Sequence, residues 1–339
     1  MPPPAQPGFF PRFRQSPTLA LLFAVGVGAL YGFCGRLIFS SDRSETSGAL
    51  FSVMSLAFLF LVPLGIGYVT IALAPPRLLN RRAYVVLAPW LAVLLAVLGV
   101  WITGWEGKIC IAMLLPLLLP MSNAGGGMAL AMRRRQWGRR VYGVGLASVL
   151  LLPYVAAPVE GAVPPAWQLR VVERQVRIRA TSEQVWRQIV RVPRIRPGEY
   201  GTSLVHRIGF PRPVEATLSR EGVGGVRRAS FERGVVFTET VTEWEPGATL
   251  SFSIHADPAT IPPGALDQHV TVGGRYFDVL DGSYRIEPAG AGQVVLHLSS
   301  THRLSTRFNF YASLWSDLVM RQIQSNILQV VRTRAEAAG

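Results

Sequence analysis

Five long stretches without a charged residue fill most of the first 160 positions of this sequence. They are residues 15–35, 46–76, 83–105, 109–132 and 141–159, and their lengths are 21, 31, 23, 24 and 19 residues. A helix needs about 20 predominantly apolar residues to cross a bilayer. The first 160 residues are therefore predicted to form an all-α transmembrane bundle of five helices. The predicted spans are about 17–38, 49–74, 83–104, 109–132 and 141–159.

The fourth stretch carries the residues least suited to a straight helix. Pro116 and Pro120 remove backbone donors, and Asn123 precedes three consecutive glycines at 125–127. Proline inside a helix kinks or breaks it. We expect a full span here, with a re-entrant or broken segment as the alternative.

Arginines are distributed unequally between the two sets of loops. One set holds Arg12 and Arg14, then Arg77, Arg81 and Arg82, and then the block "RRRQWGRR", which contains Arg133, Arg134, Arg135, Arg139 and Arg140. The other set holds only Arg36, Arg43 and Lys108. Because positive loops stay in the cytoplasm, the block is interpreted as a topogenic loop rather than a nucleic-acid patch. The prediction is a multi-pass protein of the inner (plasma) membrane with a cytoplasmic N-terminus and an extracytoplasmic C-terminal domain.

The charge pattern changes near residue 160. Residues before 166 contain 13 of the 34 basic and 4 of the 20 acidic residues, and the remainder of the chain contains the others. The Pro/Gly-containing segment 161–167 is predicted to be a linker, and residues 168–336 are predicted to form a separate domain. Such a charge density is typical of a folded soluble domain.

The second half shows an α+β pattern. "LRVVERQVRIRA" alternates with period two, as a strand does, and "TSEQVWRQIVR" switches to helical period with Thr181 or Ser182 as its cap. Further strands follow, separated by the predicted turns "EPGA", "DG" and "PAGAG", and residues 308–337 form a long closing helix. The apolar stripe expected on this helix starts at Tyr311 and Trp315 and repeats every four residues.

Two segments of this half resemble a known superfamily. "VRIRATSEQVWRQI", with Ala180, Val185 and Trp186, resembles the opening of the START-like, helix-grip (SRPBCC) superfamily. "GVVFTETVTEWEPGATLSFSI" is similar to the middle strands of its polyketide cyclase/dehydrase and lipid-transport branch. The resemblance covers about residues 168–335. It implies a curved antiparallel sheet gripping a C-terminal helix around a cavity for apolar or amphipathic ligands, and it transfers no catalytic residue.

Strand alternation selects the candidate ligand-binding residues. Phe237 and Glu239 share the apolar face of one strand, and Phe252 lies on that of the next. A carboxylate there is costly to bury unless it is paired. Glu239 is therefore either a polar group of the cavity or the ion-pair partner of Arg227 or Arg228. The remaining predicted cavity residues are aromatic: Tyr276, Tyr311 and Trp315.

The histidines do not indicate a catalytic or metal site. Alternation places His255 and His297 on the outward faces of their strands, and His206, His269 and His302 lie near predicted turns or strand ends. The sequence has neither the H-E-x-x-H spacing of a zinc site nor a dinucleotide, phosphate-loop or G-x-S-x-G motif. No cofactor and no metal are therefore predicted.

These observations predict a membrane-tethered domain that binds a hydrophobic or lipid-like small molecule for transfer, sequestration or sensing. One alternative is a cyclase, dehydratase or hydrolase that uses Glu239 as acid or base in the same cavity. Another is an interaction module of a membrane complex. We expect binding rather than catalysis because the sequence offers Glu239 no proton-transfer partner. Ligand identity and oligomeric state do not follow from the sequence.

Overall fold

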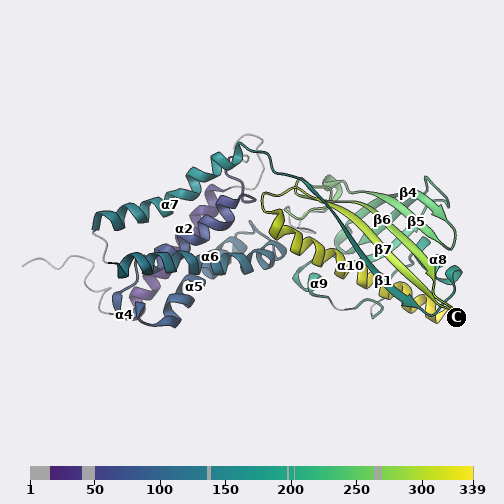
Figure 1. The fold of residues 1–339 in the computed structure, drawn as a ribbon, viewed down its shortest axis with the longest axis horizontal. Helices are drawn as coiled ribbons and strands as arrows, with labels where there is room; N and C mark the ends of the chain where they lie inside the picture. Colours follow the sequence, from purple (N-terminus) through teal and green to yellow (C-terminus); the bar gives the residue numbers. More distant parts are fainter. Residues whose placement is uncertain are drawn as a thin grey trace, which may run out of the picture. The chain divides into compact units, whose positions relative to one another are not determined.

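The computed structural model describes residues 16–39, 50–135, 139–196, 198–201, 203–262, 266 and 269–338 (Figure 1). The chain divides into two compact units. The helical unit consists of residues 1–106 and 111–164, and the second unit consists of residues 107–110 and 165–339.

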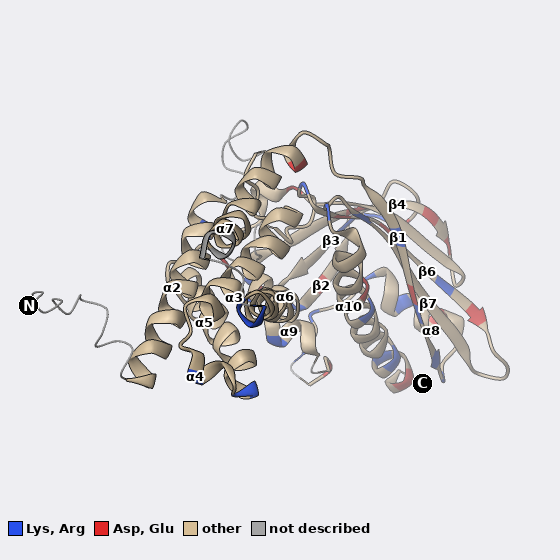
Figure 2. Ribbon diagram, turned by 60° about the vertical axis from the view of Figure 1, so that its left-hand side comes forward, with Lys and Arg blue, Asp and Glu red and all other residues tan. Residues whose placement is uncertain are grey.

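The helical unit contains the elements α2 (Pro17–Ile38), η1 (Ala57–Leu61), α3 (Val62–Ala72), α4 (Pro76–Leu79), α5 (Arg82–Ile102), α6 (Lys108–Arg134) and α7 (Arg139–Gly161). Within the described residues, four helices are long and apolar enough to cross a membrane: α2, α5, α6 and α7, the last over Gly143–Gly161. Figure 2 shows these helices almost free of charged residues between their ends.

The second predicted span is shorter than expected. Instead of residues 49–74, its apolar helix covers only Ala57–Ala72. The Glu160 carboxylate accepts hydrogen bonds from the N–H groups of Leu56 and Ala57, at 2.7 and 3.0 Å, and so starts the helix there. Its first turns are the π-helix η1, which precedes Pro63. Since Pro63 cannot donate a backbone hydrogen bond, a wider turn accommodates it. Pro75 and Pro76 follow the end of α3.

The fourth predicted span is continuous. Helix α6 includes both Pro116 and Pro120 and covers 27 residues, or about 40 Å. Asn123 does not loosen it: with its amide turned to suit both neighbours, it donates to Val86 O (3.0 Å) and accepts from Trp90 Nε1 (2.7 Å) of α5. Gly125 allows the backbone of α3 to approach, since a Cβ there would collide with Leu64 O. The prolines therefore do not break the helix, and Gly125 serves its packing against α3.

One end of the helical unit is marked by a buried ion pair. Arg36, in the last turn of α2, lies 2.9 Å from Glu106, and its guanidinium also donates to Phe39 O at 2.9 Å. The Phe39 ring contacts the rings of Phe58, near the start of the η1–α3 helix, and Tyr154, near the end of α7. The end of α2, the start of η1 and the end of α7 therefore lie at the same end of the unit.

The opposite end is marked by Arg133, one of the predicted topogenic residues. Its guanidinium donates to the carbonyl oxygens of Ile71, Ala72 and Ala74, where α3 ends. Arg134 and Arg135 are exposed, and the side chains of Arg139 and Arg140 lie outside the described residues. The 16-residue η1–α3 helix therefore runs from the Glu160 end of the bundle to the Arg133 end.

The second unit contains β1 (Gln168–Ile178), α8 (Ser182–Val190), α9 (Leu204–Ile208), β2 (Pro213–Leu218), β3 (Val226–Phe231), η2 (Glu232–Gly234), β4 (Val236–Glu245), β5 (Thr249–His255), η3 (Pro258–Thr260), β6 (Phe277–Pro288), β7 (Val294–Leu304) and α10 (Asn309–Ala337). The seven strands form one antiparallel sheet in the order β1-β7-β6-β5-β4-β3-β2. Helix α10 packs along β1 and β7, on the inner face of the curved sheet (Figure 1). This arrangement fits the helix-grip fold that the sequence predicts.

Local signals in the sequence explain how this unit is closed. Thr181 caps α8, and Gln184 completes a capping box with it. The amphipathic α8 buries Trp186, whose ring meets Trp244 of β4 edge to face at 5.1 Å. Trp186 is 6% exposed and belongs to the core of this unit.

One predicted turn is wrong. Asp281 and Gly282, the "DG" pair, lie inside β6, where the pairing with β7 shifts by one residue between Val279 and Asp281. The Asp281 carboxylate accepts the N–H of Thr301 at 3.0 Å and so stabilises this bulge. Gly282 is required because a Cβ would lie 2.7 Å from the ring of Phe252. The pair thus marks a bulge with a close side-chain approach, a known alternative role of glycine in strands.

Candidate functional site

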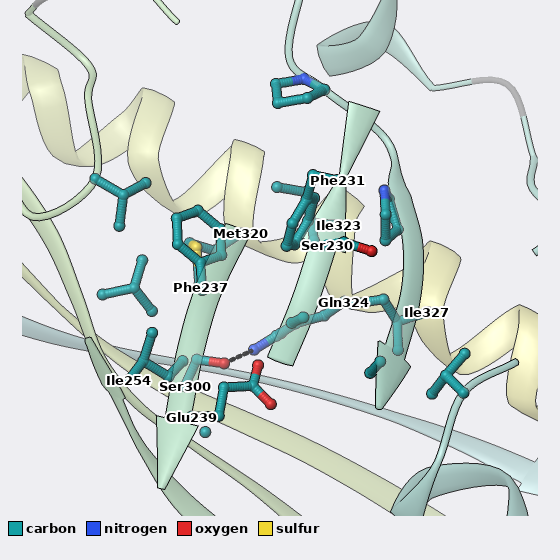
Figure 3. Close-up of a pocket in the computed structure, with 18 of the residues that line it drawn as sticks. Ser230, Phe231, Phe237, Glu239, Ile254, Ser300, Met320, Ile323, Gln324 and Ile327 are labelled. Carbon is teal, nitrogen blue, oxygen red and sulfur yellow. Dashed lines mark hydrogen bonds between the residues drawn. The ribbon is translucent and has the colours of Figure 1, made fainter. Parts of the chain in front are cut away.

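A cavity of about 170 Å³ lies between the inner face of the sheet and α10. An apolar cavity of roughly 150 Å³ takes up benzene, so this space suffices for a ligand of at least one aromatic ring. Its walls are mostly apolar and come from β2 to β7, the segments before β2 and β6, and one side of α10. Figure 3 shows aromatic and aliphatic side chains of the strands facing those of the helix across the cavity.

Strand alternation places three of the predicted residues on the cavity wall. Phe237 and Glu239 of β4 and Phe252 of β5 all line the cavity. The bulge in the β4–β5 pairing lies between Val241 and Glu243, beyond Glu239, so it leaves the alternation at Glu239 intact.

Glu239 forms a buried ion pair with Arg227 across the β3–β4 ladder. The two residues are directly opposite in register, and they are 6% and 4% exposed. Arg227 Nη1 donates to Glu239 Oε2. The Arg227 guanidinium also lies over the ring of Phe252, 5.3 Å from its centroid. The polar role and the ion pair, which the sequence leaves as alternatives for Glu239, therefore occur together.

The same part of the cavity wall holds a third titratable group. Tyr284 of β6 is 3% exposed, and burial raises the pKa of its phenol, with the Arg227 charge acting in the opposite direction. Burial likewise raises the pKa of the Glu239 carboxyl, and Arg227 opposes that effect. The ion pair and the phenol make this the polar end of an otherwise apolar cavity.

Gln324 of α10 adds a second polar contact to this end. It is 2% exposed, and its Nε2 donates to Val172 O at 2.9 Å and to Ser300 Oγ at 3.1 Å. In Figure 3, Glu239, Ser300 and Gln324 lie close to one another, away from Phe231 and Met320. Among the described residues, Gln324 Oε1 and Arg227 Nε are buried without a hydrogen-bond partner.

Three of the predicted aromatic residues do not line this cavity. Tyr276 precedes β6 and packs against Arg275 and His269, while Tyr311 and Trp315 lie in the first turns of α10. The residues of α10 that do line it are Val319, Met320, Ile323, Gln324, Ile327, Val330 and Val331.

The reason for this difference on α10 is geometric. Four residues overshoot a helical turn by about 40°, so a stripe repeating every four residues winds around the helix. Val319, Ile323 and Ile327 face the cavity, but Tyr311 and Trp315 have turned away from it.

Gln324 is one polar cavity residue that sequence reasoning missed. It follows Met320 by four residues, so it occupies a position on the buried side of α10 where an apolar residue is expected. A long polar side chain at such a position was the available signal. Ser300 was missed because a serine in a strand carries little information about its surroundings.

Strand alternation places His255 and His297 on the faces of their strands that point away from the cavity. His255 is exposed at the end of β5. His297 faces the side of β7 opposite the cavity, but it is covered there by Glu173 (2.8 Å) and Glu287 (3.2 Å).

His302 shares the inner face of β7 but lies next to α10 and not in the cavity wall. Its side chain is fully buried, and Nε2 lies 3.0 Å from Ser316 Oγ. Burial lowers the pKa of His302, so the fold favours the neutral imidazole. Asp317, 3.9 Å from His302 Nε2, is held in a two-point ion pair by Arg170.

No protein-family model matches the chain, and no curated protein matches its sequence. Solved structures do resemble it. The ZhuI aromatase/cyclase from Streptomyces sp. R1128 is 18% identical, with a TM-score of 0.33, and the match covers 51% of this chain and 99% of that one. Norcoclaurine synthase from Thalictrum flavum is 11% identical, with a TM-score of 0.33, over 49% of this chain and 86% of that one. Ara h 8.0201 is 11% identical, with a TM-score of 0.31, and the match covers 50% of this chain and 99% of that one. The strand order and the packing of α10 against β1 and β7 define the fold.

Proposed function

We propose that the second unit binds an apolar small molecule of lipid-like character, and that the helical unit anchors this binding domain in a membrane. The observation that carries the proposal is the cavity itself, a space of about 170 Å³ with apolar walls and one polar end. Ligand sites in proteins are commonly concave and mostly apolar, with a few polar groups that fix orientation. An interaction module with a filled core would not need such a space.

The polar end defines what the ligand carries. Gln324 Oε1 is a hydrogen-bond acceptor without a donor, and Arg227 Nε is a donor without an acceptor. Buried polar atoms are rarely left unpaired. A hydroxyl group can both donate and accept, so we propose an apolar molecule with one hydroxyl or similar small polar group directed at this end.

Binding is favoured over catalysis by the state of Glu239. A general acid or base must exchange its proton, and the partner of Glu239 is an arginine, which does not deprotonate in proteins. The ion pair therefore favours the charged carboxylate and gives it no proton-transfer partner. The raised pKa values of Glu239 and Tyr284 in one cavity are the observation that keeps an enzyme as the second candidate.

The membrane anchor is supported by the two ends of the helical unit. Arg133, Arg77 and the following Arg81 and Arg82 belong to the end where α3 and α6 finish, whereas Glu160 belongs to the other end. The short η1–α3 helix runs between these ends, so it serves as a crossing despite its 16 residues. With the arginine-rich end in the cytoplasm, residues after Gly161 lie outside it.

Binding is tested with the full chain purified in a mild detergent. Mass spectrometry identifies apolar molecules that co-purify, and the fluorescence of N-phenyl-1-naphthylamine measures occupancy. Ala229→Phe fills the cavity from β3 and should abolish probe binding. Thr240→Phe adds the same ring on the exposed face of the neighbouring strand and should leave it unchanged. Equal probe binding by both variants would refute the proposed site.

Catalysis is tested by adding the co-purified molecule back to the emptied protein. A binding protein returns it unaltered. If the wild type converts it, and Glu239→Gln slows conversion by at least about 10²-fold with probe affinity intact, the enzyme interpretation replaces the binding one.

Topology is tested with reporters. A reporter that is active only outside the cytoplasm should be active when fused after Gly339 and silent when inserted within residues 133–140. A silent C-terminal fusion beside an active cytoplasmic reporter would contradict five crossings.

A further inference from the structure

The charges at the polar end of the cavity cancel. Among the described residues that line the cavity, the charged ones are Arg227, Glu239 and Glu215. Arg227 and Glu239 are 4% and 6% exposed, lie opposite each other in register, and are joined by a hydrogen bond. Glu215 of β2 is only half-buried, so water screens its charge. The buried polar end therefore holds one positive and one negative charge.

In the described part of the cavity wall, the other elements around Glu239 bring no further charge to it. On β5, Ile254 is its apolar neighbour in register. On β6, Tyr284 stays a neutral phenol, because burial raises its pKa. The residues from β7 and α10 are the uncharged Ser300 and Gln324, which lie close to Glu239 in Figure 3. The balance thus depends on Arg227 and Glu239 alone.

This balance restricts the polar group that a ligand can bring. A ligand carboxylate at Arg227 Nε would lie beside the Glu239 carboxylate, and two carboxylates in one buried site cannot both stay ionised. An ammonium group would lie beside the Arg227 guanidinium and would meet the same difficulty. An alcohol carries no charge, and it can accept from Arg227 Nε and donate to Gln324 Oε1.

We propose that the cavity selects an uncharged ligand of the alcohol class, and that Glu239 is the specificity-determining residue that excludes carboxylates such as fatty acids; this rests on the binding site of the proposed function. The selection is coupled to pH. Burial raises the pKa of the Glu239 carboxyl, so this group takes up a proton as the pH falls. Its loss of charge leaves Arg227 unbalanced, and a carboxylate can then bind.

Three ligands with the same chain test the proposal: hexan-1-ol, hexanoate and hexylamine. Their binding to the full chain, emptied and held in mild detergent, is measured by isothermal titration calorimetry. Ala229→Phe, in which the cavity is filled, supplies the blank for partition into the detergent.

In the wild type, hexanoate and hexylamine should bind at least about tenfold more weakly than hexan-1-ol in mildly alkaline buffer. The affinity for hexanoate should rise on acidification, by up to about tenfold per pH unit for the uptake of one proton. The affinity for hexan-1-ol should not change with pH, since an alcohol enters without a proton.

Glu239→Gln keeps the hydrogen-bonding capacity of the side chain and removes its negative charge. In mildly alkaline buffer this variant should bind hexanoate at least about tenfold more tightly than the wild type does, with no dependence on pH. Glu245→Gln makes the same chemical change at an exposed position of β4 and should behave as the wild type.

The outcomes separate the proposal from the binding site on which it rests. If hexan-1-ol binds equally to the wild type and to Ala229→Phe, the cavity is not the site, and both fail. If hexan-1-ol requires the cavity but hexanoate or hexylamine binds the wild type as tightly at every pH, the site stands and the proposal is overturned. Should Glu239→Gln not fold, the pH dependence of hexanoate binding in the wild type still decides.

Discussion

The buried ion pair of Arg227 and Glu239 leads to a prediction about the unfolding free energy of variants and about how that free energy changes with pH. Three variants are compared with the wild type: Glu239→Leu, Arg227→Met and the double variant. Each single change leaves one charge at the cavity wall without its partner. The double change replaces both by apolar side chains of similar volume.

The expected sizes follow from the burial of both residues. Removing one partner of a buried pair typically costs about 3–5 kcal/mol, whereas replacing both is often neutral or stabilising. We therefore expect each single variant to lose about 3–5 kcal/mol of unfolding free energy and the double variant to lie within about 1 kcal/mol of the wild type.

The two single variants should differ in their response to pH. In Arg227→Met the carboxyl can become neutral, because burial raises the pKa of Glu239 above its unfolded value. Between these two pKa values the folded state binds more protons than the unfolded state, so stability falls as the pH rises. The loss in Arg227→Met should thus be larger in mildly alkaline than in mildly acidic buffer. The loss in Glu239→Leu should become smaller as the pH rises, since this variant lacks the carboxyl whose raised pKa makes the wild type less stable at higher pH.

The assay is urea unfolding of the full chain in mild detergent, followed by the fluorescence of the Trp186–Trp244 pair, in which Trp186 is buried. Losses below about 1 kcal/mol in both single variants would show that the pair is hydrated and not buried. A loss in Arg227→Met that grows on acidification would refute the assigned direction of the Glu239 pKa.

Three further predictions concern the same unit. Trp186→Ala should cost about 3–5 kcal/mol of unfolding free energy, while the exposed Trp167→Ala should cost little, both measured by urea unfolding followed by circular dichroism; equal losses would contradict the core assignment. In Gly282→Ala the added methyl group should push against the ring of Phe252 and lower the unfolding free energy by about 1–3 kcal/mol. The affinity for the naphthylamine probe should fall as well, and an unchanged affinity would refute that contact. The hydrogen bond from Arg334 lowers the pKa of Glu199 from its ordinary value of 4.5 to about 2. The wild type should therefore melt at a higher temperature than Glu199→Gln by a constant amount above pH 4.5, and this difference should disappear as the pH falls toward 2. A difference that persists in acid would exclude the ion pair as its source.

Properties set by local periodicity could be predicted from the sequence. Alternation within β4 and β5 is a local property, so it placed Phe237, Glu239 and Phe252 on one face without knowledge of the strand order. The capping residues of α8 were equally local. The identity of the Glu239 partner was left open between Arg227 and Arg228, because the register of β3 against β4 depends on the whole sheet.

Features decided by distant contacts could not be predicted. Helix η1–α3 starts at Ala57 because Glu160, about a hundred residues later, accepts its first N–H groups. Gly282 lies in a strand because the ring of Phe252 needs its space. The winding of α10 is predictable in principle, but which part of its surface faces the cavity depends on where the sheet holds it.

The length of the linker bears on which kind of binding the cavity serves. A domain joined to α7 by six residues can move only about 20 Å from the end of that helix. An anchored cavity is therefore restricted to ligands that enter from its own membrane or the water next to it, and it meets them at a high effective concentration. Carriage to a distant membrane would require the domain to leave, which the covalent linker prevents. Among transfer, sequestration and sensing, the geometry thus favours holding a bilayer-derived molecule at the surface or reporting its presence to the helices.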